Sequence, residues 1–184
     1  MPVPASPSKV LGSWRQTLIS CATLRRILGA ADEAAASESV YDRFTNDQFP
    51  EGTNEADPDK QPLDPYPRVV LVDGMPQTTK IYGSMSIMGS GHLQAFLEFK
   101  QLSAAELSDW YGESITDPTD RDHWIHADNL KTALRNEIIE VAQAAGCLTI
   151  TSLVEEIVGL IDPATNNGLS IWVICFQVQW EGLP

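Results

Sequence analysis

The last apolar stretch of the chain, residues 169–180, constrains the fold more than any other segment. It follows the turn residues Asn166, Asn167 and Gly168, and its side chains alternate with the period of two that is typical of a strand. One face carries Trp172, Ile174, Phe176, Val178 and Trp180, and the other carries Leu169, Ile171, Val173 and Cys175 before it becomes polar at Gln177 and Gln179. The pattern predicts a strand that is buried on both faces in its first half and on one face in its second.

The length of this strand bears on how the chain is used. At roughly 3.3 Å per residue it would extend about 40 Å, whereas a usual strand has about 5–6 residues. A compact domain of this size has a radius of gyration of roughly 16 Å. The strand is therefore expected to cross the whole domain or to project from it. We infer a sheet that is completed by neighbouring copies, and we expect the function to lie in assembly.

The other periodic segments predict an α+β fold, in which one mostly antiparallel or mixed sheet carries two long helices packed on one face. One helix is expected from Ser13 to Ala36, because Leu11, Trp14 and Leu18 begin an apolar stripe. The second is expected to start at His123 or Ala127 and to end at Ala145, before Gly146 as a C-cap. Further strands are expected at residues 40–44, 68–73, 81–88, 93–99, 148–150 and 153–161.

Turn signals divide these strands. The segments Asp73–Pro76 and Met88–Gly91 are interpreted as turns, so residues 68–99 are predicted to form a three-stranded antiparallel meander. Residues 153–161 fit a helix by spacing, but Gly159 and the β-branched residues favour a strand. That strand is predicted to form a hairpin with the last one through residues 162–168.

The net charge of −13 is concentrated in two segments of what is expected to be a single domain, residues 1–184, with a mobile tail at residues 1–8. Residues 45–67 contain six acids and one base, and residues 103–128 contain seven acids and one base. Both segments are predicted to be long acidic loops. They argue against binding of nucleic acid through phosphate neutralisation. They suit a passage that DNA crosses without sticking, a surface for a basic partner, or simply a solvated face.

Composition limits the cellular setting. The chain begins with prolines rather than the apolar core of a signal peptide, and its longest wholly apolar run is Ile171–Phe176. We therefore expect a soluble protein that contacts no membrane. Cys21, Cys147 and Cys175 lack the spacing of metal ligands and are interpreted as small buried hydrophobic residues.

Few residues offer chemistry. His123 and His126, with Asp122 or Asp128, could hold a divalent metal for a small hydrolase, but polar capping of a helix start explains the same residues. Gly83, Gly89 and Gly91 are not followed by the Lys-Ser or Lys-Thr of a phosphate-binding loop. We expect no catalytic residues, no metal and no cofactor, and therefore no enzyme.

Three aromatic residues, Trp110, Tyr111 and Trp124, lie inside the second acidic segment. Exposed aromatic residues in a polar segment are typical of interface anchors. They fit equally well with a small core that belongs to the segment itself. Both interpretations stay open at this stage, whereas His92 stands by itself in a turn and is expected to be inert.

The order of these elements resembles that of the tail terminator, or tail completion, proteins of long-tailed bacteriophages. The likeness is carried by the N-terminal helix leading into Val40–Phe44, the acidic loop ending in Pro65-Tyr66-Pro67 before residues 68–72, the helix Asn129–Ala145, the hairpin through residues 162–168, and the closing strand to Trp180. It covers most of residues 10–182. The long segments 45–67 and 103–128 depart from the smaller members of that family.

The resemblance implies a structural role in the virion. Such proteins assemble in the host cytoplasm into a ring, commonly a homohexamer, that caps the tail tube and joins the tail to the head-side neck. The implied partners are the tail tube protein and a neck or head-completion protein, and DNA passes through the lumen without specific binding. The family has no catalytic residues to transfer. A head-completion or neck protein, a tail-tube protein, and a generic α+β binding module with acidic loops are the alternatives.

Overall fold

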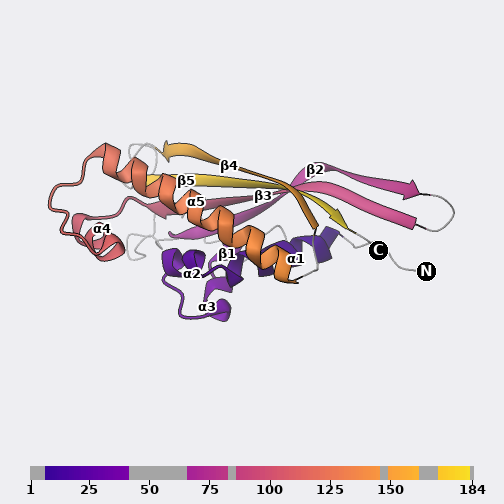
Figure 1. Cartoon of the computed structure of the whole chain (residues 1–184), viewed down its shortest axis with the longest axis horizontal. Coiled ribbons are helices and arrows are strands. Elements are labelled where there is room, and N and C mark those ends of the chain that lie inside the picture. Colours follow the sequence, from indigo (N-terminus) through magenta and orange to yellow (C-terminus); the bar gives the residue numbers. More distant parts are fainter. Residues whose placement is uncertain (1–6, 42–65, 83–85, 146–148, 162–169, 183–184) are drawn as a thin grey trace, which may run out of the picture.

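In the part of the chain that the structure describes, five strands form one mixed sheet in the order β1-β2-β3-β5-β4 (Figure 1). The computed structural model describes residues 7–41, 66–82, 86–145, 149–161 and 170–182. Strand β1 runs parallel to β2, and the other neighbours are antiparallel. The strands are β1 (Val40–Tyr41), β2 (Arg68–Tyr82), β3 (Ser86–Lys100), β4 (Thr149–Ile161) and β5 (Ile171–Gly182). With its helices, this sheet confirms the α+β class that the sequence predicts.

The N-terminal region forms three helices where one was predicted from Ser13 to Ala36. They are α1 (Pro7–Ser20), α2 (Ala22–Leu28) and α3 (Glu33–Ser37). Cys21 takes an extended conformation between the first two, with φ −70° and ψ 122°. Gly29 ends α2 with a positive φ of 65°, which glycine adopts without a steric cost. Asp32 then caps α3 by accepting a hydrogen bond from the Ala35 backbone N–H. The prediction of one long helix from Ser13 to Ala36 is therefore wrong, whereas the second long helix is confirmed as α5 (Asp120–Ala145).

The second acidic segment, residues 103–128, is largely helical, so its prediction as a loop is wrong. Helix α4 (Ala104–Tyr111) begins with a capping box between Ser103 and Glu106. Helix α5 (Asp120–Ala145) starts earlier than predicted. There the Thr119 backbone N–H donates to the Asp122 carboxylate at 2.8 Å, and the Asp122 N–H lies 3.4 Å from Thr119 Oγ1. Side-chain caps rather than a long apolar stripe define both starts.

The predicted three-stranded meander is two long strands. β2 and β3 pair antiparallel from Arg68 opposite Glu98 to Tyr82 opposite Ser86. Both predicted turns, at residues 73–76 and 88–91, lie inside these strands. The register shifts between Gly74 and Thr78, and this irregularity accommodates the glycine and proline that were interpreted as a turn. Figure 1 shows the far end of this hairpin extending past the helices.

The last strand is confirmed, as is its pairing with residues 153–161, which form part of β4. Ile171, Trp172, Val173 and Ile174 are all buried, and afterwards burial alternates, with Phe176, Val178 and Trp180 buried and Gln179 exposed. However, β5 lies between β3 and β4 inside the sheet. The length of this strand, from which a sheet completed by neighbouring copies was inferred, is therefore accommodated within one chain.

The helices pack against one face of the sheet and form one hydrophobic core with it. Helices α1, α2 and α5 contribute Trp14, Leu24 and Leu134, each at most 1% exposed. The sheet contributes alternate residues only: Val69, Leu71, Leu93, Ala95, Leu97, Phe99, Trp172, Ile174, Phe176, Val178 and Trp180. Residues of the opposite parity form a second face, which no described helix covers and which we call the open face, although Ile171 and Val173 on it are buried.

Several predicted features lie outside the described residues. These are the tail at residues 1–6, most of the loop at 45–67, Gly146, Cys147 and the turn at 162–168. Pro7 and Ser8, predicted as part of the mobile tail, begin α1.

Candidate functional site

Strand β4 forms one edge of the sheet. Within the described residues it pairs with β5 only, along Thr149–Ile161. The register shifts between Ile150 and Ser152 and again between Ile157 and Gly159, where φ is 130°. A regular stretch of strand therefore runs from Ser152 to Ile157. We call this stretch the β4 edge, and its outer hydrogen-bonding groups are a template for a further strand.

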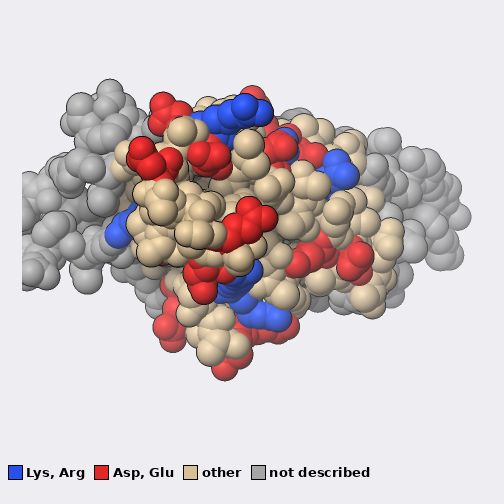
Figure 2. Space-filling model, turned by 60° about the vertical axis from the view of Figure 1, so that its left-hand side comes forward, with Lys and Arg blue, Asp and Glu red and all other residues tan. Residues whose placement is uncertain are grey.

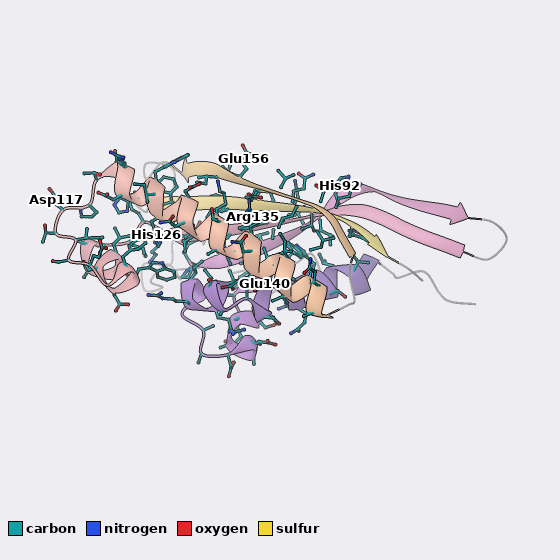
Figure 3. The ribbon with its side chains drawn as sticks, in the orientation of Figure 1. His92, Asp117, His126, Arg135, Glu140 and Glu156 are labelled. Atoms are coloured by element: carbon teal, nitrogen blue, oxygen red, sulfur yellow. The ribbon has the colours of Figure 1, made fainter. Side chains whose placement is uncertain are left out.

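The open face next to this edge is apolar at its margin. Val154 and Val158 are 58% and 57% exposed, which is high for valine in a strand. Glu156 lies between them and opposite Cys175, and Figure 3 shows it pointing away from α5. Exposed valines beside an unpaired edge are typical of a surface that another chain covers.

The centre of the open face is a set of cross-strand pairs. Arg68 Nε donates to Glu98 at 2.6 Å, and Gln94 Nε2 lies 3.4 Å from Gln177 Oε1. Between these polar pairs, Val70 is opposite Phe96, and Phe96 is opposite Cys175. This face combines a half-buried apolar centre with polar pairs, which is the mixture found in many interfaces.

Strand β2 forms most of the opposite edge. Strand β1 covers it only at Val69 and Val70. From Leu71 to Tyr82, β2 has a described partner on one side alone, β3. The sheet thus ends in two edges of comparable length, and the β2 edge continues into the projecting hairpin.

One end of the molecule, opposite the β2–β3 hairpin, is formed by α4, the α4–α5 connection and the first turns of α5 (Figure 1). The acidic residues of these three segments lie at this end. Figure 2 shows acidic side chains spread over this end with fewer basic ones between them, and Figure 3 places Asp117 in the connection. Asp122 is held at the start of α5 by Thr119, and these hydrogen bonds lower its pKa. Asp128 pairs with Lys131 at 2.7 Å. Capping and local pairing therefore account for both carboxylates that were considered as metal ligands.

The two histidines of α5 are buried and do not converge on a common point with those carboxylates. His123 is 6% exposed and His126 is 3% exposed. The Nδ1 atom of His126 lies 2.9 Å from the Tyr111 hydroxyl, and its ring packs edge-on against Trp110 at 5.3 Å between centroids. Within the described residues, no group of three His, Cys, Asp or Glu side chains could hold a metal ion.

Burial fixes the charge of His126. Removal from water lowers its pKa to about 4, and the nearby charges of His123 and Arg26 act in the same direction. Burial also raises the pKa of the Cys21 thiol to about 12, with a further contribution from Glu137. Burial likewise raises the pKa of Cys175. His126 is therefore neutral near pH 7, and both thiols stay protonated there.

The aromatic residues of the second acidic segment were predicted to be either interface anchors or a small core of the segment itself, and the structure shows some of each. Trp110 is half-buried and packs against the core. Trp124 is 50% exposed and meets Trp172 edge-on at 5.7 Å, and Tyr111 is 37% exposed. The sequence identified these residues but did not show that His126 joins them. His92 lies in the strand β3 rather than in a turn.

A comparison with protein-family models finds none that matches this chain, and a comparison with curated proteins finds no similar one. Among the helices of the described residues, none combines the length and the apolar character needed to span a membrane.

Proposed function

We propose that this protein is a structural virion protein that forms a ring, as the tail terminators of long-tailed bacteriophages do. In this role a homo-oligomer, most simply a hexamer, caps the tail tube and joins the tail to the head-side neck. DNA passes through the lumen and is not bound specifically. The protein needs no catalytic residue, metal or cofactor for this role.

The observation that carries the proposal is the pair of sheet edges, in β4 and in β2 from Leu71 to Tyr82, that have no further partner strand among the described residues. The β4 edge and the β2 edge belong to one sheet and lie on its opposite sides. A strand edge of one copy that pairs with the other edge of the next copy makes a head-to-tail contact. Such a contact closes into a ring when the rotation between copies allows it, whereas two identical edges would stop at a dimer.

The layered arrangement supports the same reading. Among the described residues the helices pack against one face of the sheet, and Val154 and Val158 on the open face are exposed where a neighbouring copy could contact them. The acidic end and the projecting hairpin lie at opposite ends of the molecule (Figure 1). In a ring, one of these ends can line a passage that repels DNA phosphates while the other reaches an adjacent ring.

A second candidate is a binding module for a basic partner, in the virion or elsewhere. It is favoured by the seven acids against one base in residues 103–128. This function requires salt-sensitive binding to the partner and no self-association. A neck or tail-tube protein of the same particle is a closer alternative, and a tube protein stacks into long polymers.

The native mass of the purified protein, with negative-stain images of the same sample, tests the proposal. We expect closed rings of uniform size, or rings formed on the ends of added tail tubes. Long tubes would favour a tube protein instead. A monomer that persists at high concentration and at tube ends would contradict the proposal.

A further inference from the structure

A pocket of about 660 Å³ lies where α2, α4, α5 and the end of β3 meet. This volume is within the roughly 300–1,000 Å³ range of small-molecule sites. Its exposed lining residues are Arg26, Ala105, Glu106 and Asp109, so the pocket opens to solvent. No residue of the β4 edge lines the pocket.

The inner wall is aromatic and apolar. Phe99 and Leu130 are 4% and 2% exposed and form its base with Trp110. The Arg26 guanidinium lies 3.8 Å from the centroid of the Trp110 ring. A cation over one face and an edge-on histidine hold this indole in place, so the wall is formed before any ligand arrives.

His126 is the buried polar group of this wall, and its tautomer decides what it offers a ligand. Asn129 Nδ2 donates to the Tyr111 oxygen at 3.3 Å, and the same hydroxyl lies 2.9 Å from His126 Nδ1, where either group can be the donor. In the tautomer in which Tyr111 donates to Nδ1, the neutral ring carries its own proton on Nε2. No described residue forms a hydrogen bond with Nε2, so this N–H remains available to a ligand.

We propose that this pocket binds a planar aromatic group that carries a carbonyl or carboxylate oxygen. The ring would stack among Trp110 and Phe99, and the oxygen would accept the proton of His126 Nε2. Arg26 and Lys100 lie in the same lining, with Glu106 and Asp109 as the acidic groups that face them. The Ser103 backbone N–H and hydroxyl both donate to the Glu106 carboxylate at 2.7 Å. Its charge therefore caps α4.

This ligand chemistry has two sources, a free aromatic compound and an aromatic residue of a polypeptide. Titration of isotope-labelled protein with N-acetyl-tryptophanamide represents the first, and a blocked hexapeptide with one central tryptophan represents the second. N-acetyl-leucinamide is the probe without an aromatic ring. We expect an aromatic probe to shift the His126 imidazole signals and to bind at least tenfold more tightly than the leucine probe.

Two variants locate the binding. Ala105→Leu fills the exposed mouth without removing a core side chain, and it should weaken binding at least tenfold. His126→Gln should weaken it roughly fivefold, the effect of one neutral hydrogen bond. Trp124→Ala, outside the lining, should bind as the wild type does. A preference for the peptide over the free amide assigns the pocket to a partner chain, and the reverse assigns it to a small molecule.

The proposal is overturned if neither aromatic probe shifts the His126 signals, or if Ala105→Leu binds as tightly as the wild type. It does not depend on ring formation, because binding is measured on the same sample whose native mass is determined separately. A monomer that binds the probe therefore contradicts the proposed ring and supports the proposed pocket. A ring that does not bind the probe supports the proposed ring and contradicts the proposed pocket.

Discussion

Glu137 of α5 caps the first turn of α2 through Thr23. The Thr23 backbone N–H donates to Glu137 Oε2 at 2.9 Å, and its hydroxyl donates to Oε1 at 2.6 Å. Cys21, which precedes α2, makes no side-chain cap. A carboxylate from a distant helix thus accepts from one N–H of the first turn of α2, and it complements the helix dipole. This contact helps to explain why the chain interrupts its helix at Cys21.

Removal of this carboxylate should destabilise the protein. Glu137→Ala leaves the Thr23 N–H and hydroxyl without their acceptor, which costs about 1–3 kcal/mol. Glu137→Gln keeps one acceptor oxygen and should cost about 1 kcal/mol or less. Urea unfolding followed by circular dichroism measures both. Glu140→Ala, an exposed change on the same helix, is the matched control and should stay within roughly 0.5 kcal/mol of wild type. Equal stability of Glu137→Ala and wild type would show that the cap contributes nothing.

The sequence predicted what depends on local pattern. The alternation of residues 171–180 determined both the strand and its burial, because side chains of a strand point to opposite faces in turn. The break at Cys21 is accompanied by the contact of Thr23 with Glu137, more than one hundred residues away, and no local pattern reveals that contact. The turn signals at Gly74 and Gly89 failed for a related reason, because pairing with a long neighbouring strand overrides a weak turn preference.

The candidate sites were predictable to different extents. Trp110, Tyr111 and His126 were each noticed in the sequence, but their contact depends on α4, which begins at a capping box that was overlooked. Ser103-x-x-Glu106 is the signal that could have found it. The β4 edge could not be found from the sequence, because the place of a strand within its sheet depends on topology.

Stability should depend on pH through His126. Its pKa is about 4 in the folded chain against an ordinary value of 6.5, so the unfolded chain binds a proton in this window while the folded chain does not. Stability therefore rises as pH increases from about 4 to 6.5, and it is fully present above that range. The whole effect is of the order of 3 kcal/mol. The difference between the free energies of unfolding in urea at pH 5 and at pH 7.5 measures the larger part of this effect.

His126→Gln provides the comparison for this pH effect. The variant has no titrating group at this position, so its stability should change less between the two pH values than that of the wild type. Tyr111→Phe removes one hydrogen bond but keeps the histidine, so it should lose about 1 kcal/mol and retain the pH dependence. Identical pH dependence of wild type and His126→Gln would refute the assignment.

Strand β5 should be an intramolecular core element. Phe176 is 2% exposed within one subunit. Phe176→Ala should therefore cost about 3–5 kcal/mol whatever the protein concentration, because the cavity forms inside the chain. Thermal unfolding over a hundredfold range of concentration measures this loss. A destabilisation that vanished in the dilute sample would mean that neighbouring copies, rather than the chain itself, shelter this strand.

The β4 edge should control assembly without controlling folding. Val154→Lys and Val158→Lys place charges on exposed positions beside the edge, where desolvation and repulsion oppose docking of a neighbour. Each monomer should stay within about 0.5 kcal/mol of wild-type stability, while the native mass falls from that of the ring to that of the single chain. Ile139→Lys is the matched control, since Ile139 is 36% exposed on the helical side, and it should leave the ring intact. Rings that form equally well from the valine variants would exclude this edge as the contact, and loss of rings in the Ile139 variant alone would move the contact to α5.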